Sequence, residues 1–391
     1  MPSHDLLSRR SRRAGDLVYV GATDATDEDG TIQYPGDVLG QARVVWQKVA
    51  LELQDHGASL DDIVDVVVFV KEPREIDSVW RQGFNASNRE GAAWTLAAVS
   101  GTRHPAALVA ARVIAHTGDL PRFTATPAAQ SWRKRFPGAA VVRKGDYLFV
   151  SGQSGLEPDG SAPIPQLHIP QARKAYELLL EAVAEVGSSL DDLLDFTSFH
   201  EDIRGAEPTL ATVYIPELLR GVDPDNAPTT SHLGALGLAS PGTLSTFRSI
   251  GDMSPGRRVA ATPDSIWWKG FYPIAGAAKK AGGRLITIAG QVACNPDQSV
   301  HAPGDPRAQA EYIWHSMAES LAIFGATMAD VIEVTSFHKD LRNLPVVLDE
   351  AAAHFEEAGP AWSAVQVPGL WMEGYLHEIS ATAWLPEGNG A

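Results

Sequence analysis

The stretch Ser59-Leu60-Asp61-Asp62-Ile63-Val64-Asp65-Val66 returns twice further along the chain. It reappears as Ser189-Leu190-Asp191-Asp192-Leu193-Leu194-Asp195-Phe196 and as Thr327-Met328-Ala329-Asp330-Val331-Ile332-Glu333-Val334, after steps of 130 (59 to 189) and 138 (189 to 327) residues. A second marker, a turn of small residues, recurs in the same register at Ala22, Gly152 and Gly290. Two markers in one domain-sized register predict a tandem array of three units.

The composition of the chain indicates its size class, its partners and its cellular compartment. The chain has 391 residues, 44% of them hydrophobic, which is enough for three domain cores. A formal charge of −16 disfavours a nucleic-acid partner, because phosphate backbones are bound by clustered Lys and Arg. The single cysteine, Cys294, excludes an internal disulfide and favours a reducing compartment. No apolar run is long enough to cross a bilayer. We therefore expect a cytoplasmic protein without a membrane partner.

The second unit shows the order of its elements most clearly. The hydrophobic pattern predicts, in order, a strand at 145–151, a helix at 171–186, a strand at 193–200, a helix at 209–219 and strands at 231–238 and 243–250. This order indicates an α+β unit with its helices on one face of a sheet. The other apolar face needs a cover, and three sister sheets facing a common axis would bury one another.

The joins between the units also repeat. Ala125-Thr126-Pro127 precedes Trp132, and Ala261-Thr262-Pro263 precedes Trp267. These lead-ins predict three domains, at residues 1–122, 123–257 and 258–391.

Several short motifs of the second and third units resemble one known family. In chain order they are Val150-Ser151-Gly152-Gln153, Glu157-Pro158-Asp159-Gly160, Gln171-Ala172-Arg173, Thr197-Ser198-Phe199, Ile288-Ala289-Gly290-Gln291 and Ala308-Gln309-Ala310. Their order and spacing are similar to those of the RidA (YjgF) family of imine and enamine deaminases. The resemblance covers the chain three times and is weakest in the first unit, where Gln41-Ala42-Arg43 is the best match.

The resemblance carries expectations about the fold. RidA proteins are usually homotrimers that bind small molecules in clefts between neighbouring subunits. Three fused RidA-like (chorismate-mutase-like) domains would form a pseudo-threefold trimer with a central β-barrel and outer helices. Such a chain is a monomeric pseudo-trimer, and the sequence leaves a dimer of it open. Fusion also frees the three clefts to diverge.

The family's substrate clamp is missing from this chain. Its members use an arginine near the start of the penultimate strand to hold a substrate carboxylate. The corresponding positions carry Trp94, Thr230 and Trp362. A neutral side chain cannot clamp a carboxylate, so we expect a flat, uncharged ligand and take these three as candidate substrate-binding residues.

The family's acid/base residue survives in one copy. Alignment on the last strand places Ala110, Thr246 and Glu378 at the position of that carboxylate. A carboxyl group there can move protons during hydrolysis of a C=N bond. We therefore expect one working cleft, carried by the third domain, with Glu378 as general acid/base; the alternative is a solvated strand residue.

Other candidates surround this position in the sequence. His200 and His338 each follow Thr-Ser-Phe and are candidate catalytic residues, although a histidine at a strand end also satisfies local hydrogen bonds. The third unit is rich in aromatic residues, of which Trp371 and Tyr375 are candidate pocket residues. Backbone groups of Ala289 and Gly290 can hold a substrate oxygen. In the second unit, His232 is a further binding candidate.

No cofactor or metal is expected. His, Asp and Glu residues are scattered without HExxH, and the phosphate-binding glycine motifs and Gly-x-Ser-x-Gly are absent. The leading hypothesis is a RidA-like hydrolase acting on an imine, enamine or related C–N bond of a small cyclic or aromatic molecule. The alternatives are a ring-opening amidohydrolase resembling the cyanuric and barbituric acid hydrolases, and a non-catalytic small-molecule-binding protein.

Overall fold

The computed structural model describes residues 10–87, 91–135, 138–163, 166–355 and 359–385. The first unit contains β1 (Ser11–Ala14), β2 (Leu17–Asp24), α1 (Val38–Gln54), β3 (Ile63–Val70), α2 (Ile76–Ser87), β4 (Ala93–Ala98), β5 (Gly101–Thr102) and β6 (Val109–His116). The second contains β7 (Arg122–Ala125), β8 (Val141–Lys144), β9 (Tyr147–Gln153), α3 (His168–Glu185), β10 (Leu193–His200), α4 (Ala206–Thr209), β11 (Thr229–Gly234), β12 (Gly237–Leu238) and β13 (Ser245–Asp252). The third contains β14 (Arg258–Ala261), β15 (Ala277–Lys280), β16 (Leu285–Gln291), α5 (Pro306–Ala322), β17 (Val331–His338), α6 (Leu344–Ala351), β18 (Ala361–Gln366) and β19 (His377–Trp384).

The repeated motif is the entry to the central strand of each unit. Ser59 forms a capping box with Asp62, in which each side chain accepts the other residue's backbone N–H, and the turn Leu60–Asp62 then leads into β3. Ser189 and Asp192 do the same before β10. The third copy, before β17, again carries a capping box. One local device therefore starts the same strand three times.

The strands form three sheets in the described part of the chain. Their orders are β1-β2-β6-β3-β4-β12, β11-β10-β13-β9-β8-β7 and β14-β15-β16-β19-β17-β18-β5. In each, the central strand runs parallel to the next strand of its unit and antiparallel to the last. Two sheets borrow a strand: β12 of the second unit pairs with β4, and β5 of the first unit pairs with β18.

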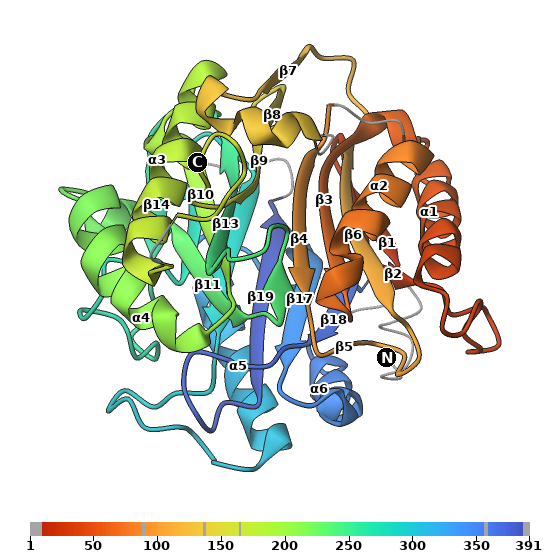
Figure 1. Cartoon of the computed structure of the whole chain (residues 1–391). Coiled ribbons are helices and arrows are strands. Elements are labelled where there is room, and N and C mark those ends of the chain that lie inside the picture. Colours follow the sequence, from red (N-terminus) through yellow and green to blue (C-terminus); the bar gives the residue numbers. More distant parts are fainter. Residues whose placement is uncertain (1–9, 88–90, 136–137, 164–165, 356–358, 386–391) are drawn as a thin grey trace.

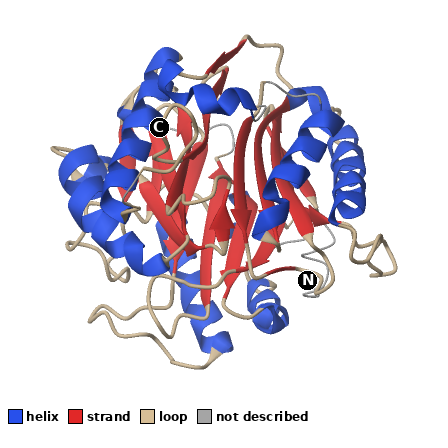
Figure 2. Ribbon diagram, viewed as in Figure 1, coloured by secondary structure: helices blue, strands red, loops and turns tan. Residues whose placement is uncertain are grey.

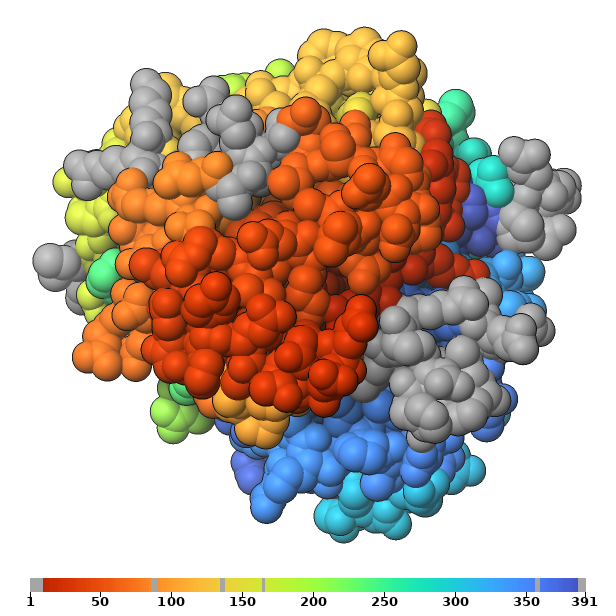
Figure 3. All heavy atoms as spheres, turned by 90° about the vertical axis from the view of Figure 1, so that its right-hand side faces the viewer, coloured from red at the N-terminus to blue at the C-terminus, as the bar shows by residue number. Residues whose placement is uncertain are grey.

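The strands occupy the centre of the molecule and the helices its outside (Figures 1 and 2). Helix α3 shows why, because its buried residues recur at helical spacing along one face. The first unit covers one face of the molecule, with the third unit below it (Figure 3). On the inner side, Phe69, Phe199 and Phe337 meet with ring centroids 6.4 and 6.3 Å apart. The α+β fold class and its three tandem copies are thus confirmed.

Local departures from the predicted elements have physical reasons. The second helix of unit two begins as α4 and continues as a wider π-helical segment, Leu210–Leu218, which contains Pro216. Proline lacks the N–H that an α-helix needs there. The strand predicted at 231–238 is divided into β11 and β12, because the chain leaves its own sheet to pair with β4.

Candidate functional site

The cleft between the second and third units holds an apolar pocket with one carboxyl group. Strand β11 of the second unit faces β16 and β19 of the third across it. The pocket is lined by Leu210, Thr230, Ser231, His232, Trp267, Trp268, Tyr272, Ile274, Gly290, Val292, Trp371 and Glu378. This set includes Glu378, Thr230, His232, Gly290 and Trp371, five of the residues predicted from the sequence. The second unit is the neighbour that completes the cleft at Glu378.

Glu378 is a buried acid without a cation beside it in this lining. Its side chain belongs to β19, and the residue is 3% exposed. Its Oε1 accepts the backbone N–H of His232, 3.3 Å away on β11. Burial raises the pKa of the Glu378 carboxyl to about 8, and the hydrogen bond from His232 opposes the rise in part. The group therefore carries a proton at neutral pH.

Gly290 lets that carboxyl approach the opposite strand. A Cβ atom at this position would collide with Glu378 Oε1 and lie 2.9 Å from Ser231 Oγ. Any side chain would therefore push Glu378 or Ser231 away. The glycine is required here for close approach.

The backbone N–H at this turn donates to a hydroxyl group in two of the three clefts. In the first–second cleft, Gly152 N–H donates to Thr95 Oγ1 at 2.9 Å. In the third–first cleft, Ala22 N–H donates to Ser363 Oγ at 2.9 Å. The equivalent bond, from Gly290 N to Ser231 Oγ, is absent among the described residues. The Gly290 N–H and the Ser231 hydroxyl at the pocket are thus not bonded to each other, whereas their counterparts in the other two clefts are.

A chain of hydrogen bonds runs from the pocket into the second unit. His232 Nδ1 lies 2.7 Å from Ser198 Oγ, which in turn lies 2.9 Å from His200 Nε2. Burial lowers the pKa of His232 to about 4 and that of His200 well below its usual value. Both rings are therefore neutral at pH 7. His232 Nε2 is buried without a hydrogen-bond partner among the described residues.

Aromatic rings make up much of the remaining lining. The Trp371 ring lies 5.2 Å from that of His232. Trp267 packs edge-on against Trp268 at 5.8 Å and against Tyr272 at 6.0 Å. Trp268 is fixed by its Nε1, which donates to Ile274 O at 3.1 Å. Flat apolar faces thus surround the carboxyl group.

Strand register makes the three acid positions equivalent. Phe337 pairs with Glu378, Phe199 with Thr246 and Phe69 with Ala110. The same registers align Trp94, Thr230 and Trp362, which stand opposite Val66, Phe196 and Val334. The positions compared in the sequence are therefore the same places in three units.

The two tryptophans at this level lie outside the pocket, in the cores of their own units. Trp94 packs against Trp46 of α1 at 5.6 Å, and Trp362 against Trp314 of α5 at 5.6 Å. The indole Nε1 of Trp362 donates to Ser336 Oγ at 2.9 Å. Only Thr230, of the three residues at this position, lines the pocket.

The remaining candidates lie elsewhere. His338 contacts Ser336 and His377 in the third unit, at 2.9 and 3.1 Å. Tyr375 is buried outside this lining, with its hydroxyl 3.5 Å from Met372 Sδ. Ala289 precedes Gly290 in β16 and packs in the core. His200 reaches the pocket only through Ser198.

Sequence reasoning missed part of the lining. Trp267, Trp268 and Tyr272 were counted only as part of the aromatic richness of the third unit. They follow the repeated lead-in Ala261-Thr262-Pro263, and that position was the available signal. Leu210 and Ser231 carried no signal, because a leucine and a serine on buried elements are ordinary core residues.

Metal-binding clusters and membrane-spanning helices are absent from the described residues. Within them, no group of three or more His, Cys, Asp or Glu side chains is arranged to hold a metal ion. In the same part of the chain, none of the helices has the length and apolar character that a membrane crossing requires.

Comparisons with known proteins give the family. The model of the endoribonuclease L-PSP family matches the chain three times, over residues 7–117, 134–240 and 277–385. The RutC family protein YjgH of Escherichia coli (strain K12) is 41% identical over 75 residues, 19% of this chain and 56% of YjgH, so the match spans about half of that relative. A RutC family protein of Pyrococcus abyssi is 30% identical over 102 residues, 26% of this chain and 80% of that protein.

A whole-chain likeness supports the arrangement of the three units. A solved chorismatase structure covers 83% of this chain and 93% of its own, with a TM-score of 0.53 and 17% identity. At that identity the likeness concerns the fold alone. Three successive family matches and the three equivalent sheets lead to one conclusion: the chain belongs to the RidA (YjgF) family and carries three RidA domains in tandem.

Proposed function

We propose that the chain hydrolyses a C=N or enamine bond of a small, uncharged, ring-containing molecule in the cleft between the second and third units. Glu378 is the general acid/base. The observation that carries the proposal is a buried carboxyl group, protonated at neutral pH, in an aromatic pocket whose described lining contains no Lys or Arg. Raised carboxyl pKa values of this kind are typical of general acids.

The residues that line the pocket favour an uncharged, flat substrate. A carboxylate substrate would lose its hydration without gaining a cationic partner, which is unfavourable in an apolar pocket. A flat neutral ring instead gains contact with Trp267, Trp268 and Trp371. The neutral Glu378 also avoids repelling or ion-pairing with the ligand.

The reaction begins with proton transfer from the Glu378 carboxyl to the imine nitrogen. The iminium carbon that results is attacked by water, which forms the new C–O bond and yields a carbinolamine after it loses a proton. The proton lost by water then reaches the nitrogen and the C–N bond breaks. The carbinolamine hydroxyl gives its proton to the Glu378 carboxylate as the carbonyl forms, and the carbonyl compound and an amine or ammonia leave. Protons are conserved, because the two gained by nitrogen come from Glu378 and water, and Glu378 is protonated again at the end.

His232 supports the removal of the proton from water. Ser198 Oγ lies 3.2 Å from Ser231 O, to which its single hydroxyl proton is donated. Both histidine nitrogens beside Ser198 then act as N–H donors, which leaves a lone pair on His232 Nε2 in the pocket. A neutral imidazole with a free lone pair can accept a proton from a bound water.

The backbone N–H of Gly290, which makes no bond to Ser231 in the described part of the chain, can also take part in the reaction. Its counterparts in the other two clefts are bonded to hydroxyl groups. At the pocket, the N–H can donate to the oxygen that develops on the substrate carbon. This extends the role expected for the Ala289-Gly290 turn.

The test compares Glu378→Gln with Thr246→Ala, which changes the equivalent position of another cleft. The purified proteins are incubated with benzophenone imine, with dihydroisoquinoline and with a cyclic amide, phenylsuccinimide, and the products are measured. We expect imine turnover by the wild type and Thr246→Ala, and a loss of about 10²- to 10⁴-fold in Glu378→Gln.

Other outcomes would exclude the proposal. Full activity of Glu378→Gln would remove the carboxyl from the mechanism. Turnover of the cyclic amide alone would identify a ring-opening amidohydrolase. Saturable quenching of tryptophan fluorescence by the imines, without turnover of any compound, would identify a binding protein.

A further inference from the structure

A second polar site lies on the central axis and shares one lining residue, Ser231, with the pocket. Each central strand places one acid there, Asp65, Asp195 and Glu333, at the same position of the repeated motif. The neighbouring last strands place Arg112 opposite Val67, Arg248 opposite Thr197 and Ser380 opposite Thr335. Three equivalent acids thus face two arginines and one serine.

The arginines follow one pairing rule around the axis. Arg112 of the first unit forms two bonds with Glu333 of the third, one of them 2.5 Å from Nη2 to Oε2. Arg248 of the second unit contacts Asp65 of the first, at 2.6 Å. Each arginine therefore pairs with the acid of the preceding unit. By the same rule, a cation at Ser380 would pair with Asp195.

Asp195 is the acid that lacks such a partner. Among the described residues it forms no ion pair; it accepts the Ile250 N–H at 2.5 Å and the Thr197 hydroxyl at 3.1 Å. Asp65, by contrast, contacts both arginines. Burial raises the pKa of Asp195, although Arg248 nearby opposes the rise. With every group ionised, the cluster carries one uncompensated negative charge.

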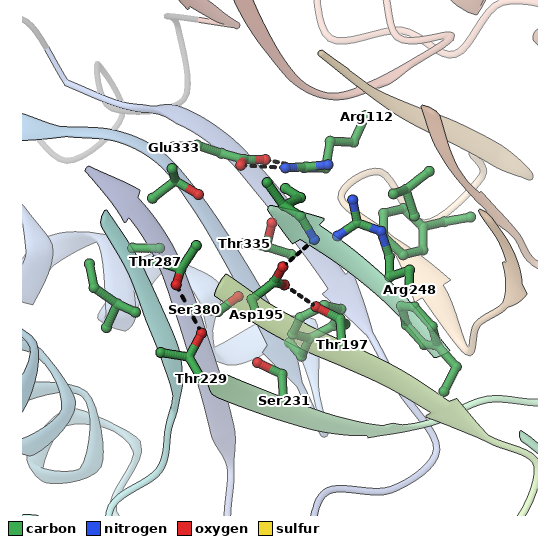
Figure 4. Close-up of a pocket in the computed structure, with 18 residues that line it drawn as sticks. Arg112, Asp195, Thr197, Thr229, Ser231, Arg248, Thr287, Glu333, Thr335 and Ser380 are labelled. Atoms are coloured by element: carbon green, nitrogen blue, oxygen red, sulfur yellow. Dashed lines mark hydrogen bonds and ion pairs between the residues drawn. The ribbon is translucent and has the colours of Figure 1, made fainter. Parts of the chain in front are cut away.

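A cavity occupies the place of the missing arginine (Figure 4). The cavity has a volume of about 50 Å³, which is room for a few waters or one ion of several heavy atoms. Hydroxyl groups line it, at Thr197, Thr229, Ser231, Thr287, Thr335, Ser380 and Thr382. Ser231 is 5% exposed, and its hydroxyl makes no hydrogen bond among the described residues. Arg112 and Arg248 also line the cavity, but they are paired with Glu333 and Asp65. The cavity thus offers a cation the Asp195 carboxylate and the oxygens of the surrounding hydroxyl groups.

We propose that this cavity binds a small cation with several N–H donors, guanidinium or ammonium, against the Asp195 carboxylate. The cation takes the place that an arginine side chain would fill at position 380. Its N–H groups donate to Asp195 and to the surrounding hydroxyl oxygens, and its charge balances the cluster. The proposal does not rest on the hydrolysis proposed above, although Ser231 lines both cavities.

The test measures the thermal unfolding of the full chain in millimolar guanidinium chloride, ammonium chloride or sodium chloride at equal ionic strength. A ligand of the folded state raises the Tm in a saturable way. We expect a rise with guanidinium, ammonium or both, above that in sodium, and the larger effect identifies the ion. A response equal to that in sodium chloride would overturn the proposal.

Variants separate the site from general salt effects. Asp195→Asn removes the charge and should abolish the response. Ser380→Arg supplies the cation from the chain, so it should raise the Tm without added ions and no longer respond. Ser380→Thr keeps the hydroxyl and should respond as the wild type does. An Asp195→Asn protein that still responds fully would refute the assignment, whether or not Ser380→Arg folds.

Discussion

The second–third cleft and the third–first cleft are built from equivalent strands of different units and differ at three positions. The first of these clefts combines Thr230, Glu378 and a Gly290 N–H that makes no bond to Ser231 among the described residues. The other has Trp362 and Ala110 at the equivalent positions, and its backbone N–H, at Ala22, is bonded to Ser363. The third–first cleft keeps a smaller cavity, whose lining includes Trp362, Ala22 and Asp24, but it lacks an acid at the position of Glu378. The proposed chemistry therefore belongs to the second–third cleft.

The largest expected effect on activity comes from placing at position 230 the tryptophan that the other two units carry at the equivalent position. Thr230→Trp replaces a small side chain that lines the pocket with an indole, and the equivalent Trp362 borders the smaller cavity of the third–first cleft. Because the ring enters the space of the substrate, kcat/KM for the active imine should fall by about 100-fold or more. Thr230→Ser is the control and should keep most activity. An active Thr230→Trp protein would show that the substrate binds elsewhere.

The pH dependence tests the protonation of Glu378. The carboxyl must hold its proton to act as an acid, and its pKa is about 8. The value of kcat/KM for benzophenone imine should be flat near neutrality and fall about tenfold per pH unit above pH 8. On the acid side, activity should fall near pH 4, as His232 gains a proton. Unfolding curves across this range exclude loss of structure, and a flat profile above pH 8 would contradict the acid role.

The Glu378→Gln variant, which should lose activity, should gain stability at neutral pH. A carboxyl ionises near pH 4.5 in the unfolded chain but keeps its proton to about pH 8 in the folded protein. Stability is therefore lost as pH rises between those values, by about 3 kcal/mol at pH 7. Glu378→Gln removes this loss, so urea unfolding should show it to be more stable than the wild type at pH 7, with the difference vanishing near pH 4. Equal stability at pH 7 would mean that Glu378 is ionised.

The smallest expected effect is on activity in the third–first cleft. Ala110→Glu restores the acid there but leaves Trp362 in place, so the Glu378→Gln/Ala110→Glu double variant should stay as inactive as Glu378→Gln. The buried carboxyl should lower its Tm. Recovered turnover of benzophenone imine would show that an acid alone makes a working cleft.

The repeat itself made much of the fold predictable. Markers in one register fixed three units, and the alternation of strands and helices gave the α+β class. The uniqueness of Glu378 was also readable, because strand register follows from the same markers. These features are local or periodic, so a single sequence contains them.

The rest depended on contacts between units. The sequence could not say that the second unit faces Glu378, since that requires the order of sheets around the axis. Trp362 was expected to line the pocket, yet it packs against Trp314 of its own unit. A strand residue points to one face or the other, and both faces are buried in this molecule. The gap at Ser380 likewise emerges only when Asp65, Asp195 and Glu333 are seen around one axis.

The two strands that pair with the sheet of another unit limit how such a protein could lose one of its three copies. Strand β12 of the second unit covers the edge at β4, and β5 of the first unit covers the edge at β18. A gene that lost one copy would leave sheet edges unpaired, and unpaired edges promote aggregation. The copies are thus tied together by their hydrogen bonds as well as by the peptide chain. Individual clefts are free to lose their chemistry, while the number of copies is held at three.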